Sequence, residues 1–184
     1  MAGLSDEQLI ERCHTGQTEA FGELVERYQS PIYNAILRMV REDDDAQDLT
    51  QTVFVKAFEN LDRYDSQYAF FSWLYRMAMN ETINFLNRQK RQSPLQQEIE
   101  SRERNPEDKR ADDEFSERIA DALMELTLDY RLVIVMRHFL DFTYREMSEI
   151  VSVPEKTVKS RLFSARRRLC EILSAHGITA AYYD

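Results

Sequence analysis

A polar segment near the middle of the chain most constrains how this sequence can fold. Residues 92–114, QSPLQQEIESRERNPEDKRADDE, contain almost no apolar side chains and include two prolines. Such a segment cannot bury a hydrophobic core, so it favours a solvated linker, although part of it could form a polar surface helix. In either case it separates two units, and a length of 184 residues suits two small domains.

Apolar residues recur at helical spacing on both sides of this segment, which predicts an all-α fold. The chain has only 4 glycines and 4 prolines, whereas an all-β fold needs many tight turns. Before the polar segment, the spacing predicts a compact helical domain whose last helix runs from about residue 72 to residue 91. After the segment, helical spacing resumes at Phe115 and predicts a second small helical domain.

Local signals predict several helix boundaries. The stretches SDEQ (5–8) and TYRE (143–146) have the spacing of a capping box, in which each side chain bonds to the other residue's backbone N–H. Pro31 is predicted to mark a kink or a new helix start. Pro154 suits the first position of the final helix, where its missing N–H costs nothing.

The chain is acidic overall, with a formal net charge of −9. This charge predicts weak nonspecific attraction of the free protein to DNA, but it leaves room for a local basic site. The first residues are acidic where a signal peptide would be basic and then apolar, and no apolar run is long enough to cross a membrane. The sequence therefore predicts a soluble cytoplasmic protein without membrane insertion.

No constellation typical of catalysis or metal binding is found in the sequence. The three histidines are scattered, and the two cysteines, Cys13 and Cys170, lack metal-ligand spacing. Cys13 falls on an apolar face and is expected to pack in the core, whereas Cys170 is compatible with exposure. We therefore predict a protein that is not an enzyme, with no catalytic residues, no metal and no cofactor.

Positive charge is concentrated in TVKSRLFSARRRL, residues 157–169. A short capped helix, a three-residue turn and this second helix predict a helix-turn-helix motif. In a major groove, Lys and Ser side chains bond base edges, Phe touches thymine methyls and Arg holds phosphates. The residues predicted to be available to DNA are Lys159, Ser160, Phe163, Ser164, Arg166 and Arg167. The alternative interpretation is a solvated helix with incidental basic residues.

A stripe of amides and arginines follows one face of the predicted helix 72–91. Its members are Trp73, Arg76, Asn80, Asn84, Asn87 and Arg91. Amides read bases, arginines hold phosphates, and an exposed aromatic ring can stack on an unpaired base. Further aromatic residues lie at or just before the start of this helix, at Tyr64, Tyr68, Phe70 and Phe71. Phe70 and Phe71 are equally compatible with the core, whereas Tyr64 and Trp73 are expected to be exposed.

Carboxylates crowd the stretch DDAQDLTQTVFVKAFENL, residues 44–61. The helix macrodipole alone explains acids near a helix start. DNA phosphates would repel this surface, so any partner of it must be a basic protein surface. The polar residues concerned are Asp44, Asp45, Asp48, Gln51, Thr52 and Glu59.

Three stretches together resemble the bacterial extracytoplasmic-function (ECF) sigma factors, the minimal two-domain sigma subunits of RNA polymerase. They are DDAQDLTQTVFVKAFENL, FFSWLYRMAMNETINFLNRQKR and FTYREMSEIVSVPEKTVKSRLFSARRRL, and they occur in the order and spacing of that family. The resemblance implies sigma region 2 in residues 1–92, a linker in 93–114, a helix-turn-helix sigma region 4 in 115–176 and a tail in 177–184.

The resemblance implies an alternative sigma factor that binds core RNA polymerase and directs promoter recognition and transcription initiation. The implied contacts with the clamp helices of the largest polymerase subunit are Asp45, Asp48, Gln51, Thr52 and Glu59. The residues implied in melting the minus-ten region and capturing a flipped base are Tyr64, Trp73, Arg76, Asn80, Asn84 and Arg88. Those implied in reading the minus-thirty-five duplex are Lys159, Ser160, Arg161, Phe163, Ser164, Arg166 and Arg167.

The other implied partners are the polymerase beta flap, promoter DNA and an anti-sigma protein, and the resemblance implies no obligate homo-oligomer. The chain departs from the family in three respects that bear on the second domain. Thr127 stands where the family commonly has proline, glycine is usual near Asp141 and at Ser152, and Ser164 stands where relatives often have a second arginine.

Two other classes of protein compete with this interpretation. A helix-turn-helix transcriptional regulator with an N-terminal sensing or dimerisation domain explains residues 115–172 equally well. It gives no reason for the stripe that begins at Trp73, and it predicts dimer binding to a palindrome. A helical adaptor without DNA binding leaves the basic helix unexplained.

Overall fold

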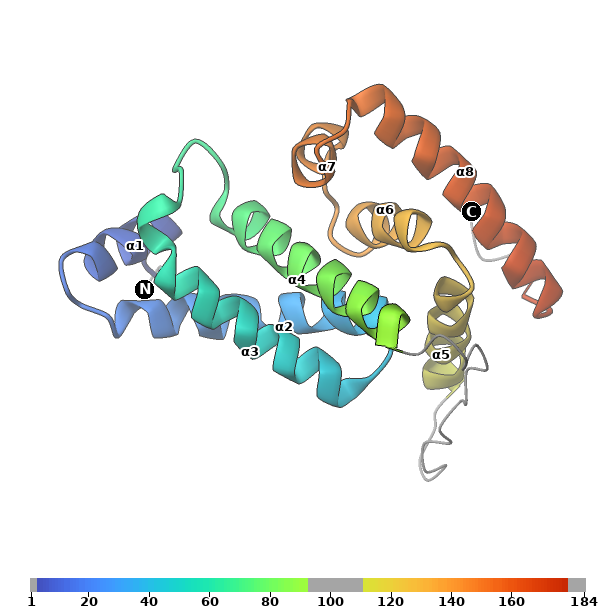
Figure 1. The fold of residues 1–184 in the computed structure, drawn as a ribbon, viewed down its shortest axis with the longest axis horizontal. Coiled ribbons are helices and arrows are strands. Elements are labelled where there is room, and N and C mark those ends of the chain that lie inside the picture. The colour runs from blue at the N-terminus through green and yellow to red at the C-terminus, as the bar shows by residue number, and fades with distance from the viewer. Residues whose placement is uncertain (1–2, 93–110, 179–184) are drawn as a thin grey trace. The chain divides into compact units, whose positions relative to one another are not determined.

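Residues 3–92 and 111–178 are described by the structure, a computed structural model. All regular structure in these ranges is helical, which confirms the all-α prediction (Figure 1). The elements are α1 (Asp6–His14), α2 (Ala20–Val40), α3 (Asp43–Glu59), the 3-10 turn η1 (Leu61–Arg63), α4 (Phe70–Gln92), α5 (Ala111–Met124), α6 (Leu128–His138), α7 (Tyr144–Val151) and α8 (Glu155–Ala175).

The chain divides into two compact units, residues 1–84 and 85–184, and helix α4 runs across the boundary. Most of the predicted linker, residues 93–110, and tail residues 179–184 lie outside the described residues. Helix α5 begins at Ala111, a few residues inside the segment predicted as linker. The polar helix considered for part of that segment therefore exists at its end.

The first unit is built on α2, which packs against both α1 and α3. Ser5 and Gln8 form the predicted capping box at the start of α1. The prediction of a new helix start at Pro31 is wrong, because α2 continues through it as one helix. A proline inside a helix costs about 3 kcal/mol. Five core residues follow it on α2 and offset that cost by burial: Ile32, Ala35, Ile36, Met39 and Val40.

The second unit depends on a buried arginine. Arg131, on α6, is 7% exposed, and its guanidinium donates hydrogen bonds to the carbonyl oxygens of Leu123 (2.9 Å), Met124 (2.9 Å) and Leu126 (3.3 Å). These carbonyls lie at the end of α5, where a helix leaves its last acceptors without intrahelical partners. Burial lowers the pKa of Arg131 to about 10, so the side chain keeps its charge at neutral pH.

Helices α7 and α8 and the turn between them form the predicted helix-turn-helix. Thr143 and Glu146 make the second capping box, as predicted. Ser152 ends α7 with φ 53°, in the left-handed region that favours glycine. Asp141 also has φ 53°, so both positions where the family usually has glycine need this conformation. Pro154 is the N-cap of α8 and not its first residue, because its extended ψ of 145° precedes the helix.

Replacing the buried guanidinium should destabilise the second unit. Arg131→Met keeps the aliphatic bulk but removes the guanidinium donors to these three carbonyls, so we expect a loss of about 3 kcal/mol in the free energy of unfolding. Urea unfolding of the full chain, followed by circular dichroism, measures this. Arg118→Met, at an exposed position of α5, is the matched control and should change stability by less than about 0.5 kcal/mol. Equal losses in both variants would contradict the capping role of Arg131.

Candidate nucleic-acid interface

The outward face of α8 is fixed by the stripe that the helix buries. Val158, Leu162 and Ala165 are at most 1% exposed, and Ile172 and Leu173 continue the same stripe. Five predicted DNA-contacting residues lie away from it and are exposed: Lys159, Ser160, Phe163, Arg166 and Arg167. Phe163 is 71% exposed, which is unusual for a large apolar side chain. This face therefore offers charge, a hydroxyl and one apolar ring together.

Two predicted residues of α8 do not belong to that exposed group. Arg161 is turned toward α6, where its guanidinium lies 3.3 Å from the Asp129 carboxylate and its side chain is only 23% exposed. Ser164 is half-buried. The structure therefore separates Arg161 and Ser164 from the five exposed residues, because they lie on the flank of the helix nearer its packed side.

The exposed cations of α8 have intramolecular partners. Lys159 Nζ lies 3.8 Å from Glu155 and 5.1 Å from the centre of the Tyr144 ring. Arg167 Nε lies 3.5 Å from Glu171. Exposed pairs of this kind contribute at most about 1 kcal/mol, so a phosphate can replace the carboxylate at little cost. Both side chains are thus held near α8 without being locked in place.

Arg166 is oriented by a histidine from α6. Its Nε donates a hydrogen bond of 3.1 Å to His138 Nε2, so this ring nitrogen must be unprotonated. The pKa of His138 lies below its usual 6.5 because burial disfavours the charged form and because Arg166 and Arg137 are close, while Asp141 acts in the opposite direction. Neutral His138 leaves the two terminal nitrogens of Arg166 available to a phosphate.

Helix α4 presents the predicted amide and arginine stripe on its outer face. Arg76, Asn80, Asn84 and Arg88 are all exposed. The opposite side carries a buried stripe made of Phe70, Leu74, Tyr75, Ala78, Met79 and Thr82. Within this stripe the Thr82 hydroxyl donates to the Ala78 carbonyl of the same helix at 2.8 Å. The side chains of the outer stripe are therefore held on the solvent side of the helix.

The aromatic residues at the start of α4 form a packed cluster. Tyr64 contacts Phe70 and Trp73 edge-on, with ring centres 5.5 Å apart in each case. The Tyr64 hydroxyl donates to the Tyr68 carbonyl at 2.6 Å and closes the loop between η1 and α4. Phe70 is 2% exposed, so the core interpretation holds for it, whereas Phe71 is half-buried.

The expected exposure of Tyr64 and Trp73 is only partly correct, because both rings are half-buried against Phe70. Tyr68 is the more accessible aromatic of the loop, with 48% of its surface exposed. The sequence contains no signal for this difference, since it depends on which ring the loop folds inward.

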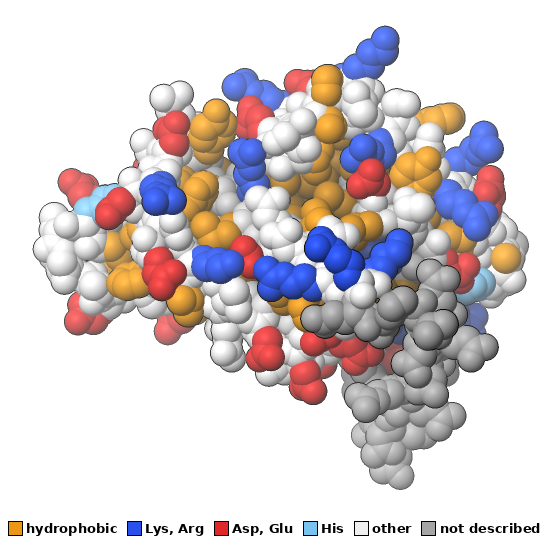
Figure 2. All heavy atoms as spheres, viewed as in Figure 1, with side chains coloured by type: hydrophobic (Ala, Val, Ile, Leu, Met, Phe, Trp, Pro, Cys, Tyr) orange, Lys and Arg blue, Asp and Glu red, His pale blue; other side chains and the backbone are white. Residues whose placement is uncertain are grey.

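The acidic surface of α3 has an apolar margin. Asp48, Gln51, Thr52 and Glu59 are exposed, and they line a groove of about 460 Å³ together with Val55 and Lys56. Val55 is 57% exposed and Phe58 is 44% exposed, although helical spacing places Phe58 among the apolar residues of this helix. Figure 2 shows the acidic side chains gathering at the lower margin of the face in view, over the beginning of α3.

Charge repulsion is visible within this acidic surface. Partial burial raises the pKa of Asp45 above its usual range, and the neighbouring carboxylates of Glu42, Asp48 and Asp44 raise it further. Asp43 is instead satisfied internally by the Tyr33 hydroxyl and by the Gln47 amide at 2.6 Å. A cationic partner on this surface would therefore relieve repulsion among these carboxylates.

The three histidines lie in separate places, with His14 on α1 and His176 just beyond α8 paired to Asp62 and Glu125. Within residues 3–92 and 111–178, no group of three or more His, Cys, Asp or Glu side chains could hold a metal ion.

Cys13 is buried and Cys170 is exposed, as expected. No helix in the described part of the chain is both long and apolar enough to span a lipid bilayer.

Comparison with known proteins decides between the interpretations. The family model for Sigma-70 region 2 matches residues 24–92, and the model for Sigma-70 region 4 matches residues 116–169. The chain is 32% identical over 184 residues to RNA polymerase sigma-H factor of Pseudomonas aeruginosa, covering 91% of this chain and 93% of that protein. The chain belongs to the ECF sigma factors. It is also 33% identical over 178 residues to the sigma-E factor of Escherichia coli, covering 90% of this chain and 93% of the relative.

Solved sigma-factor structures agree with this membership. The chain is similar to CnrH in complex with the cytosolic domain of CnrY, with a TM-score of 0.71 and 25% identity over 91% of this chain and 96% of that one. The sigma factor RpoE of Bartonella quintana, solved with the anti-sigma factor NepR, shares the fold at a TM-score of 0.71 and 22% identity, over 84% of this chain and 96% of its own.

Membership of the family settles the class of function. The protein is an alternative sigma factor that binds core RNA polymerase and promoter DNA and directs transcription initiation. It is a non-enzymatic initiation factor, which confirms the prediction that it is not an enzyme. The alternative of a regulator with a sensing or dimerisation domain is not favoured.

The histidine behind Arg166 should make the stability of the sigma factor depend on pH. The pKa of His138 is lower in the folded than in the unfolded chain. Neutral His138 therefore contributes fully to the free energy of unfolding above about pH 6.5, and this contribution is lost as the pH falls through the pKa of the folded state. His138→Gln keeps an acceptor for Arg166 but does not titrate, so we expect it to lose less stability than wild type between about pH 7 and pH 5. Urea unfolding at both pH values measures the difference. Identical losses in the two proteins would contradict it.

Proposed function

We propose that the two units of this sigma factor divide promoter recognition between them, with region 2 in residues 1–92 and region 4 in 115–176. Residues 93–114 would link the two regions, and 177–184 would form a tail. In this proposal α4 and its aromatic loop capture the minus-ten element as single-stranded DNA, whereas α8 reads the minus-thirty-five element as duplex. Since core RNA polymerase and promoter DNA lie in the bacterial cytoplasm, we propose that the chain acts there as well.

The outer face of α4 is the observation that carries the proposal. Arg76, Asn80, Asn84 and Arg88 combine phosphate-holding and base-reading groups in one exposed row. The loop before this row supplies Tyr64, Tyr68 and Trp73, whose rings can stack on a base that has left the duplex. A reader of closed duplex has no need for an aromatic platform beside its base-reading amides.

The α8 face suits a major groove. Its exposed members combine Lys159 and Ser160, which can bond base edges, with Phe163, which can touch thymine methyls. Arg166 and Arg167 are placed to hold phosphates on either side. Arg161 and Ser164 lie on the flank, so we assign them supporting contacts at most.

The acidic surface of α3 is proposed to dock on a basic surface of the polymerase, the clamp helices of its largest subunit. The proposed contacts are Asp45, Asp48, Gln51, Thr52 and Glu59. The exposed Val55 and Phe58 give this surface apolar area beside the charges, as a protein interface needs. The raised pKa of Asp45 favours a positively charged partner, since such a partner stabilises the ionised carboxylate. We further propose that the second unit contacts the beta flap.

A net charge of −9 keeps the free chain from binding DNA strongly. Once the polymerase holds both units, the second DNA contact becomes intramolecular and gains effective concentration, so two weak sites bind a promoter together. Similar sigma factors have been solved with an anti-sigma factor or with a cytosolic domain bound. We propose that an anti-sigma protein likewise covers the recognition faces of this chain.

Run-off transcription tests the assignment of α3 and α4. The full chain is mixed with bacterial core polymerase and a fragmented genomic library, and transcript starts are mapped. We expect discrete starts that share two spaced upstream motifs. Asn80→Ala combined with Asn84→Ala should bind core polymerase normally but lose at least about 90% of these starts, because base contacts are lost. Asp48→Lys should instead fail to bind core polymerase. Starts that persist in the Asn80/Asn84 variant would overturn the minus-ten assignment.

Duplex binding by holoenzyme tests the α8 face. It also distinguishes residues that bind phosphate from residues that read bases. Arg167→Ala should weaken binding to all sequences alike and lower the slope of affinity against salt by about 1, since one phosphate contact is lost. Phe163→Ala should relax discrimination at one minus-thirty-five position by roughly 1–3 kcal/mol. Band-shift titrations on a set of single-base variants measure both effects. Arg145→Ala, at an exposed position of α7, is the control.

A further inference from the structure

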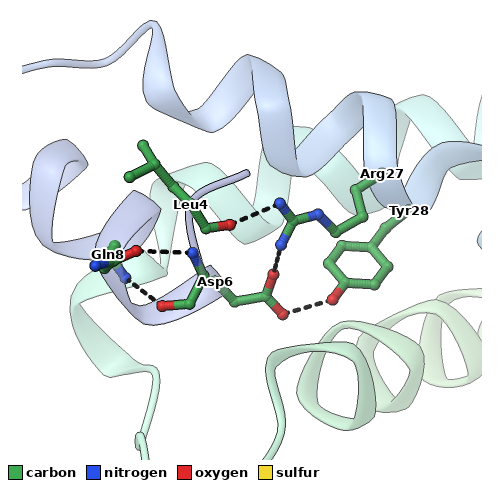
Figure 3. A network of polar contacts seen from close by, with 6 residues as sticks. Leu4, Asp6, Gln8, Arg27 and Tyr28 are labelled. Atoms are coloured by element: carbon green, nitrogen blue, oxygen red, sulfur yellow. Dashed lines mark hydrogen bonds and ion pairs between the residues drawn. The ribbon is translucent and has the colours of Figure 1, made fainter. Parts of the chain in front are cut away.

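The N-terminal helix α1 is tied to α2 by a polar cluster that lies outside the proposed DNA and polymerase faces (Figure 3). The Asp6 carboxylate accepts hydrogen bonds from the Arg27 guanidinium and, at 2.5 Å, from the Tyr28 hydroxyl. The same guanidinium donates to the Leu4 carbonyl at 2.9 Å. Helix α1 precedes the residues matched by either family model, so the comparisons assign it no role.

The Tyr28 ring continues this cluster into the aromatic loop. It stacks on Phe71 with ring centres 5.4 Å apart and 24° between planes, and it contacts Phe70 at 5.7 Å. Phe70 contacts Trp73 at 5.6 Å and Tyr64 at 5.5 Å. The path from Tyr28 to Trp73 therefore passes through one intervening ring.

A second contact joins α1 to the other end of the same loop. His14, the last residue of α1, lies 3.4 Å from Asp62, which belongs to η1 just before the loop. The pKa of Tyr64 lies above its usual value because of burial first, and also because the carboxylates of Glu7 and Asp6 are near. Helix α1 thus borders the loop directly at its η1 end and reaches its α4 end through Tyr28 of α2.

Capturing a base between aromatic rings requires that the rings be held in position before the DNA arrives. A ring contact contributes little free energy and is made over a range of centre separations, so ring contacts alone hold neighbouring rings weakly. A hydroxyl bonded to a carboxylate is directional, so it fixes the position of the hydroxyl end of Tyr28 and with it the direction in which the ring points. The rings packed against Tyr28 are then fixed in turn.

We propose that Asp6 is a positioning residue for the minus-ten step, acting through Tyr28 and Phe70 on Tyr64 and Trp73. Asp6 orders the aromatic loop for single-stranded DNA and does not itself touch the promoter. This inference rests on the proposed function of the loop.

The test compares binding of two probes by holoenzyme assembled from the full chain and core polymerase. One probe is a labelled single-stranded oligonucleotide with the nontemplate minus-ten bases of a promoter mapped for this chain. The other is a duplex with only its minus-thirty-five element. Asp6→Asn and Tyr28→Phe should each bind the single strand about five-fold more weakly and the duplex with unchanged affinity. The double variant should lose less than the two single losses combined, because both changes act on the same Asp6–Tyr28 hydrogen bond.

Trp73 provides a direct readout of the loop, because it is the one tryptophan of the chain. In the free protein, Asp6→Asn and Tyr28→Phe should shift its fluorescence emission. Glu11→Gln removes a carboxylate from an exposed position of the same helix and is the matched control, with wild-type binding and emission expected. Tyr28→Phe keeps the ring and the Asp6–Arg27 pair, so it tests the inference even if Asp6→Asn fails to fold.

The variant Trp73→Ala tests the minus-ten function of the loop independently of the positioning role of Asp6. If Trp73→Ala binds the single strand as wild type does, the minus-ten assignment of the loop itself is wrong. If Trp73→Ala weakens binding whereas Asp6→Asn and Tyr28→Phe do not, the loop assignment stands and the positioning role of Asp6 is overturned. Equal weakening of both probes by Tyr28→Phe would also overturn it, since that result indicates a general loss of structure.

Discussion

Burial of one apolar stripe on each of two long helices decides what this protein can present to DNA. A helix that buries one side must turn the opposite side to solvent, and α4 and α8 both do this. On α4 the buried Leu74 and Ala78 place Asn80 and Asn84 outward. On α8 the buried Val158 and Leu162 place the basic residues Lys159, Arg166 and Arg167 outward. The chemistry of recognition is therefore set by packing as much as by the recognition residues themselves.

The supporting polar contacts act on helix ends and on ring orientation. Arg131 satisfies the last carbonyls of α5 from inside the second unit, so the end of this helix is closed by a side chain of the helix that follows it. The left-handed residues Asp141 and Ser152 then set the angles at which α7 and α8 leave their turns. In the first unit the Asp6 carboxylate accepts a hydrogen bond from Tyr28. This contact positions an aromatic side chain, whereas Arg131 binds backbone carbonyls.

Acidic side chains gather on α3 and basic side chains on α8, and each set suits a different proposed partner. Partial burial raises the pKa of Asp45, and the neighbouring carboxylates of Glu42, Asp48 and Asp44 raise it further, a repulsion that a cationic partner would relieve. The cations of α8 are paired with Glu155 and Glu171 at exposed, weak contacts that phosphates can replace. In the proposed function, an acidic chain with a local basic helix combines low attraction to DNA when free with binding when the polymerase holds both units.

The sequence by itself determined the all-α fold, both capping boxes and the exposed faces of α4 and α8. These features follow from spacing within one helix and from side chains bonding to nearby backbone, both of which are local. Only the tertiary structure decided that α2 runs through Pro31, that Arg161 turns to Asp129 and that Tyr64 folds against Phe70. It also decided that Asp6 meets Tyr28, from another helix. Each of these depends on which distant residue lies opposite, and a periodic pattern within one segment carries no information about that partner.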